Sequence, residues 1–242
     1  MSTHLKSFAT FSAFAIASNL AFAGCDELPN QAQLKNALDV AQSQNNGGFG
    51  LDMWATIVDR DGIVCAVAMT GNDRGDQWPG SRVISAQKAN TANAFSLPGL
   101  ALSTANLYTA TQPGGSLYGL QHSNPVDTAA AYAGPSSNYG LENDPLVGQK
   151  IGGVNVFGGG LALYKKEGDQ FTVLGALGVS GDSSCADHNI AWRTREALEL
   201  NLVPGGVGPN NTDGIVYKKS SGWAHPTCSK EAETVAKAIG AG

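Results

Sequence analysis

The chain has 242 residues and a formal net charge of −5, with 14% charged residues and 31 glycines. This length suits one large domain or two small ones, and one is favoured because no linker rich in Pro, Ser and Gly separates two patterned halves. The composition excludes a largely disordered chain, and the acidic balance with scattered Lys and Arg excludes the basic footprint of a nucleic-acid partner.

The first element is a secretory signal peptide, predicted over residues 1–23. Lys6 precedes an apolar stretch of small residues, and Ala21-Phe22-Ala23 reads as an A-x-A cleavage site. A buried N-terminal helix is the alternative, but Cys25-Asp26-Glu27 turns abruptly polar. No other apolar run approaches the ~20 residues that span a bilayer. We therefore expect an extracytoplasmic protein, periplasmic or secreted.

The sequence after residue 23 first predicts a helix, then a β-hairpin and then a second helix. Asn30 and Gln33 form a capping-box signal ahead of an apolar face, which predicts a helix at about 30–45. Alternating residues predict strands at 51–58 and 63–69, joined by the turn Asp59-Arg60-Asp61-Gly62. Apolar residues at three- and four-residue steps predict a helix over 81–95.

A long segment rich in Gly, Pro, Ser, Asn and Tyr follows at about 97–150 and is predicted to be a functional cover or an elaborated loop. The remaining elements are strands at 154–164 and 171–179, a helix capped by Ser184 and Asp187, an irregular tail and a last helix at 229–239. Gly158-Gly159-Gly160 implies a bulge, or close approach of a ligand or another backbone. This order predicts an α+β fold, an antiparallel sheet with helices packed on it.

Four cysteines remain after cleavage: Cys25, Cys65, Cys185 and Cys228. An even count in an oxidising compartment predicts two disulfides, with three connectivities open, and we pair Cys185 with Cys228 and Cys25 with Cys65. A rival interpretation makes Phe22 to Cys25 a lipobox, with Cys25 acylated as a membrane anchor. Zinc is disfavoured because no two cysteines have the spacing C-x₂₋₄-C.

Three segments resemble the GlcG/HbpS family of small haem-binding proteins, which includes the C-terminal domain of PduO proteins. They are Ala55 to Gly62, like the family's strand ending in VDxxG; Ser85 to Ala92, like KAxTA; and Gly175 to Gly181 followed by Asp187, like GAIGVSG and QD. Ile151-Gly152-Gly153-Val154 is similar to the family's PGGVP hairpin entry. The similarity covers most of residues 30–200.

The resemblance implies a profilin-like single domain at 24–242, often oligomeric, that binds haem. Its core would be about 30–200, its insertion about 97–150, and its Cys-tethered C-terminal extension 203–242. Asn155 stands where the family's Pro is usual, the segment 97–150 looks longer than the family's connection, and the tail with Cys228 has no counterpart. Haem contacts vary within the family, so the iron ligand does not carry over.

Haem iron needs an axial donor in a mostly apolar slot. His122, in the long cover beside Tyr118, is the first candidate, and an exposed loop histidine is the alternative. His188, in the first turn of the helix after Gly181, is a second candidate that fits a structural role better. His225 fits the tail, and Met53 and Met69 fit the core.

Lys88 and Thr91 lie one helical turn apart and match the lysine and threonine of KAxTA. Lys88 would pair with a haem propionate or with a carboxylate such as Asp187, or would simply cover apolar surface with its stem. Thr91 would otherwise bond to its own helix. We expect the helix around Lys88 and the Gly178–Gly181 strand end to close an apolar crevice under the cover, with His122 turned inward.

No motif indicates catalysis. Ser180 misses G-x-S-x-G, and no H-x-x-x-H pair is present. We therefore expect a binding protein with a haem-sensing, storage or accessory role. The alternatives are an accessory protein or enzyme of small-molecule catabolism that uses the same pocket for another apolar organic ligand, and an interaction module without a ligand.

Overall fold

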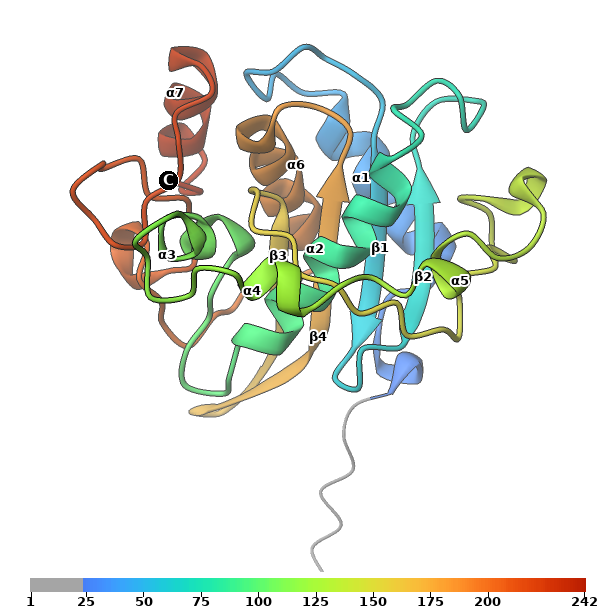
Figure 1. Cartoon of the computed structure of the whole chain (residues 1–242), viewed down its shortest axis with the longest axis horizontal. Helices are drawn as coiled ribbons and strands as arrows, with labels where there is room; N and C mark the ends of the chain where they lie inside the picture. Colours follow the sequence, from blue (N-terminus) through green and yellow to red (C-terminus); the bar gives the residue numbers. More distant parts are fainter. Residues whose placement is uncertain (1–23) are drawn as a thin grey trace, which may run out of the picture.

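The computed structural model describes residues 24–242, so the predicted signal peptide lies outside the described residues (Figure 1). The α-helices and strands of this part, in chain order, are α1 (Gln31–Gln42), β1 (Trp54–Asp59), β2 (Val64–Met69), α2 (Ser81–Phe95), α3 (Tyr108–Thr111), α4 (Leu120–Ser123), α5 (Thr128–Ala131), β3 (Gly160–Glu167), β4 (Gln170–Ser180), α6 (Ser184–Ala197) and α7 (Lys230–Ala238). No helix among them is long and apolar enough to span a bilayer.

The strands form one antiparallel sheet in the order β2-β1-β4-β3, which confirms the predicted α+β class. Both hairpins, β1–β2 and β3–β4, turn at glycines with positive φ, Gly62 (+78°) and Gly168 (+58°). The central pair β1–β4 joins the two hairpins, so the first and last strands of the chain are neighbours in the sheet and β2 and β3 form its two edges. The result is a single domain around one sheet.

Helices cover both faces of the sheet, which gives three layers (Figure 1). On one face, Ala55 and Ile57 of β1 pack with α1 and α6. On the other face, Trp54 and Val58 pack with the alanine-rich side of α2. Because both faces are covered, every residue of β1 is buried, including the polar Thr56 and Asp59.

Local signals set most boundaries. The Asn30–Gln33 capping box is present at α1, and α2 spans the predicted residues 81–95. The predicted third strand starts late, at Gly160, because the preceding glycines lie against other backbone. A Cβ on Gly158 would lie 2.4 Å from the Ser184 carbonyl oxygen. The predicted cap of α6 was wrong by one residue: Ser183, not Ser184, accepts from the Ala186 N–H.

The long segment between α2 and β3 wraps the outer side of α2 and contains the short helices α3, α4 and α5 (Figure 1). Buried Arg82 of α2 anchors it, since Arg82 Nε donates to Asp144 Oδ2 at 2.9 Å and the guanidinium stacks on Tyr139. At the other end, the Tyr164 hydroxyl donates to the Leu97 carbonyl at 2.9 Å. The segment is therefore held at both ends, by contacts with α2 and with β3, and we call it the cover.

Both predicted disulfides are present. Cys25 is bonded to Cys65 and Cys185 to Cys228, with Cα–Cα distances of 5.3 and 5.9 Å. Because the Cys25 sulfur is bonded to Cys65, it is not free for the acylation considered as an alternative. In the tail, a buried Arg195–Asp213 ion pair adds a second tether to α6.

Candidate functional site

The crevice expected between α2 and the end of β4 does not form. A Cβ on Gly178 would lie 1.9 Å from the Ser85 carbonyl oxygen and 2.5 Å from the Ala89 nitrogen. The backbones of α2 and β4 are thus in direct contact, and no ligand fits between them. That expectation was wrong because the strand-end glycines serve helix–sheet packing.

Lys88 lies inside this packed region rather than at a ligand. Its side chain is 1% exposed, and its ammonium donates to Asp187 Oδ2 at 2.7 Å and to the Val179 carbonyl at 2.9 Å. Asp187 also accepts from the Asp182 N–H at 2.8 Å. Burial raises the pKa of Asp187 to about 6 against the opposing effect of Lys88, and burial lowers the pKa of Lys88. The pair ties α2, the end of β4 and α6 together.

His188, on α6, and His225, in the C-terminal segment, are both buried. His188 packs on Trp192, and burial lowers its pKa to about 3. Burial also lowers the pKa of His225 to about 4, and its Nδ1 lies 2.7 Å from the Pro226 carbonyl. Both rings are therefore neutral at physiological pH, and the structure gives them packing positions.

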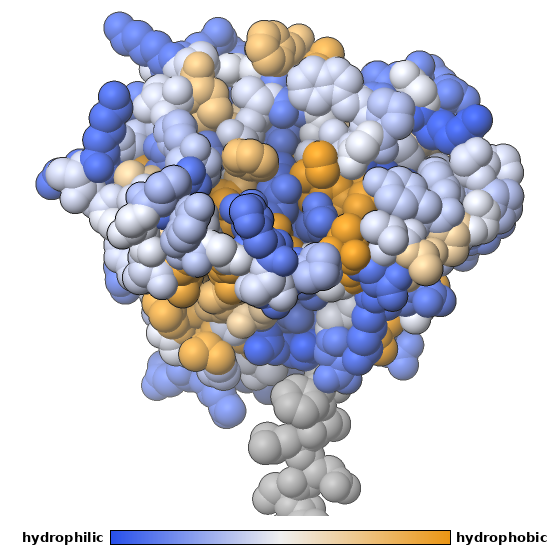
Figure 2. Space-filling view, in the orientation of Figure 1, coloured by the Kyte–Doolittle hydropathy of each residue, from blue (hydrophilic) through white to orange (hydrophobic). Residues whose placement is uncertain are grey.

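A groove of about 470 Å³ lies on the outer side of α2, under the cover. The α2 residues Asn90, Ala94 and Phe95 line one side. The other sides come from α4 and two loops, through Leu120, Ser123, Asn124, Pro125, Gly152, Gly153 and Val154. Figure 2 shows this face of the molecule hollowed near its middle, with hydrophobic residues beside hydrophilic ones. The volume falls within the range of about 300–1,000 Å³ that small-molecule sites span.

Two residues of α2 build the groove by holding the loop 151–155. Asn90 Nδ2 donates to the Gly153 carbonyl at 2.8 Å. The buried Thr91 hydroxyl accepts from the Asn155 N–H at 3.0 Å and donates to the Gln87 carbonyl at 2.7 Å. Thr91 thus bonds to its own helix, which was the alternative prediction for this residue, and it also positions the neighbouring loop. Gly152 and Gly153 adopt positive φ, +61° and +79°.

The structure places His122 on α4, at the edge of this groove. Leu120 and Ser123 of the same four-residue helix line the groove, whereas His122 is exposed to solvent, so the expectation that His122 turns inward was wrong. Tyr118 is also exposed, at 64%. The five haem-binding candidates are therefore divided: His122 and Tyr118 lie on the cover, Thr91 supports the groove, and Lys88 and His188 are buried elsewhere.

Sequence reasoning missed Asn90, Ala94 and Phe95 as groove residues. Asn90 and Ala94 gave a weak signal, because they fall on the outer side of a helix whose apolar pattern reports the side facing the sheet, and Phe95 was counted as part of that pattern. The loop Gly152-Gly153-Val154 was noticed for its glycines, but its contact with α2 depends on residues about 60 positions earlier in the chain.

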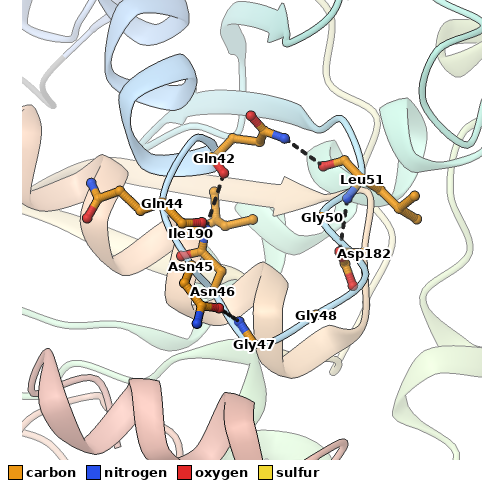
Figure 3. A pocket seen from close by; sticks show the side chains of 10 residues that line it. All are labelled: Gln42, Gln44, Asn45, Asn46, Gly47, Gly48, Gly50, Leu51, Asp182 and Ile190. Carbon is orange, nitrogen blue, oxygen red and sulfur yellow. Dashed lines mark hydrogen bonds between the residues drawn. The ribbon is translucent and has the colours of Figure 1, made fainter.

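A second, smaller pocket of about 90 Å³ lies between the loop after α1 and the start of α6 (Figure 3). Amide side chains of Gln42, Asn45 and Asn46 line it with Asp182. The Asp182 carboxylate accepts from the N–H groups of Phe49 (2.8 Å) and Leu51 (3.2 Å), so it fixes the loop. This pocket is well below the ~300 Å³ at which small-molecule sites begin.

A family model described as "Haem degrading protein HbpS-like" matches residues 30–196. Among solved structures, a PduOC:haem complex is 24% identical, covering 70% of this chain and 91% of that chain, with a TM-score of 0.47. Klebsiella pneumoniae protein ORFY is 22% identical, with coverages of 78% and 98% and a TM-score of 0.49. A double mutant of Streptomyces reticuli HbpS is 14% identical, with coverages of 80% and 99% and a TM-score of 0.45. No curated protein matches the sequence.

Proposed function

The chain belongs to the HbpS-like family, and from this premise we propose that it is an exported protein that binds haem in the groove between α2 and α4. The observation that carries the location is the groove itself, about 470 Å³ and lined by Ala94, Phe95, Leu120, Pro125 and Val154 together with polar groups. Those apolar side chains suit the faces of a porphyrin, which needs an apolar environment.

The family's description and the solved PduOC:haem complex both name haem. The polar groups of the groove lining are Asn90, Ser123 and Asn124, two amides and a hydroxyl that suit hydrogen bonds to a ligand. We therefore propose binding, in a sensing, storage or accessory role, rather than catalysis. Organic ligands of similar size are the alternative occupants, and assembly into a homo-oligomer remains part of the proposal.

His122 is the proposed axial ligand, with Tyr118 beside it on the cover. Of the histidines in residues 24–242, it alone is exposed, since His188 of α6 and His225 of the C-terminal segment are buried. Ligation requires the short helix α4 to turn its imidazole toward the groove. A four-residue helix on a loop has few contacts that oppose such a movement.

A visible-absorption titration of residues 24–242 with haemin tests this proposal. We expect a Soret shift that saturates near one haem per chain. His122→Ala should change the position of the bound Soret band and weaken binding at least tenfold, because it removes the iron donor. Gln121→Ala, the neighbour on α4 that does not line the groove, is the matched control and should bind as the wild type.

The groove is tested separately from the ligand. Ala94 is exposed within the groove, so Ala94→Trp should fill it without disturbing the core and should weaken haemin binding by tenfold or more. Absence of any saturable shift in the wild type would contradict haem binding. Unchanged binding by Ala94→Trp, with wild-type circular dichroism, would contradict the location.

Export is proposed from the signal-peptide pattern of residues 1–23 and is compatible with the two disulfides. We expect the intact mass of the protein recovered from outside the cytoplasm to correspond to residues 24–242 less four hydrogens, and to rise by four hydrogens on reduction. A mass that retains residues 1–23, or that carries an acyl chain, would contradict this maturation.

A further inference from the structure

The Cys185–Cys228 disulfide lies beside a histidine. One ring nitrogen of His225 and the two sulfur atoms all lie within 4.8 Å of one another. Cys185 and His225 are buried, whereas Cys228 is exposed, so the cluster opens to solvent on one side only. Two thiolates and one imidazole are the ligand types that Zn²⁺ prefers, and three protein ligands with an open fourth position are a common arrangement.

The surroundings favour the protonation states that bind a metal, which are the thiolates of the two cysteines and the neutral imidazole of His225. The Cys185 N–H, in the first turn of α6, donates to Cys228 Sγ at 3.2 Å, and the Cys228 N–H donates to Cys185 Sγ at 3.2 Å. Such donors stabilise thiolates, as does a helix N-terminus. The Pro226 carbonyl, 2.7 Å from His225 Nδ1, can only accept, so Nδ1 carries the proton and Nε2 keeps its lone pair. A carbonyl that fixes the ring in this way is typical of histidines that bind metals.

The backbone spacing also suits a metal. Two thiolates on one zinc ion lie about 3.8 Å apart, at Zn–S distances of about 2.3 Å and a tetrahedral angle. The Cα atoms of Cys185 and Cys228 are 5.9 Å apart, so side-chain rotation alone can separate the sulfurs that far. The Gly158 N–H lies 3.4 Å from Nε2 and holds it only weakly, so a metal can displace that contact.

We propose that reduction converts this disulfide into a zinc site formed by Cys185, Cys228 and His225, with water as the fourth ligand. A reductant supplies two electrons to the sulfur–sulfur bond. With a phosphine, water provides the oxygen of the phosphine oxide and its two hydrogens go to the two sulfurs. Binding of Zn²⁺ then releases both thiol protons. The oxidised chain has no such site, because its sulfurs are bonded to each other.

The test uses residues 24–242 carrying Cys25→Ser and Cys65→Ser, so that only one cysteine pair remains. The chain is reduced with a phosphine, which competes weakly for zinc, and titrated with Zn²⁺ against a colorimetric chelator. We expect one zinc per reduced chain and none per oxidised chain. Co²⁺ in place of Zn²⁺ should give thiolate-to-metal charge-transfer absorption. His225→Ala should lower zinc affinity at least tenfold, because it removes a ligand, whereas His122→Ala should leave it unchanged.

Near-ultraviolet circular dichroism of the reduced chain accompanies each titration. The proposal is overturned if the reduced, folded chain binds no zinc, or if His225→Ala binds it as tightly as its parent. It is also overturned if reduction alone abolishes the near-ultraviolet signal, since the folded structure that brings the three ligands together is then lost with the disulfide. None of these outcomes depends on haem.

Discussion

Gly178→Ala is expected to destabilise the protein by about 3 kcal/mol or more, at the upper end of what overpacking a core costs. The methyl group would lie 1.9 Å from the Ser85 carbonyl oxygen and 2.5 Å from the Ala89 nitrogen. Both atoms are backbone atoms of α2, so no side-chain rotation relieves the contact and the helix must move off the sheet. Gly178 has no positive φ, so the effect is steric and not conformational.

Urea unfolding of the oxidised chain measures this change as a lower midpoint at an unchanged m-value. Gly99→Ala is the matched control, because a Cβ there meets nothing within 4 Å and φ is not positive. This variant should be as stable as the wild type, or more stable by a few tenths of a kcal/mol, because alanine lowers the conformational entropy of the unfolded chain. Equal midpoints for Gly178→Ala and the wild type would contradict the direct contact of α2 and β4.

Lys88→Met is expected to cost about 3–5 kcal/mol at pH 8, because it leaves the Asp187 carboxylate buried without its cation. Methionine has nearly the length of the lysine stem, so little packing is lost. Asp187→Asn in the same chain should recover most of this loss, since the amide oxygen can still accept from the Asp182 N–H. Urea unfolding of both single variants and the double variant measures the coupling.

The cost of Lys88→Met should also depend on pH. Burial already raises the pKa of Asp187 from 3.8 to about 6, and loss of Lys88, which lowers it, should raise it further. The folded variant then binds a proton more tightly than the unfolded chain does. Its stability therefore falls as pH rises above about 4 through the folded pKa, so the deficit should be largest at pH 8 and smallest at pH 4. A deficit that is constant from pH 4 to 8 would contradict a buried, ion-paired carboxylate.

The sequence determined the elements of this protein because their signals are local. The Asn30–Gln33 box, the Asp59-Arg60-Asp61-Gly62 turn and the three- and four-residue spacing within 81–95 each act within a few residues, and the corresponding elements formed where expected. The cysteine pairs were also predicted correctly, because only a few pairings exist. Family membership followed from the order of short motifs along the chain.

Only the tertiary structure decided what these motifs do. The resemblance of 85–92 and 175–181 to the family motifs suggested a ligand crevice, yet the glycines bring two backbones into contact and Lys88 pairs with Asp187 across 99 residues. The groove instead depends on Asn90 reaching Gly153, and the sulfur–imidazole cluster on His225 lying beside α6. Local pattern reports which side of an element is apolar, but it contains no information on which distant residue that side meets, since that is set by how the layers pack.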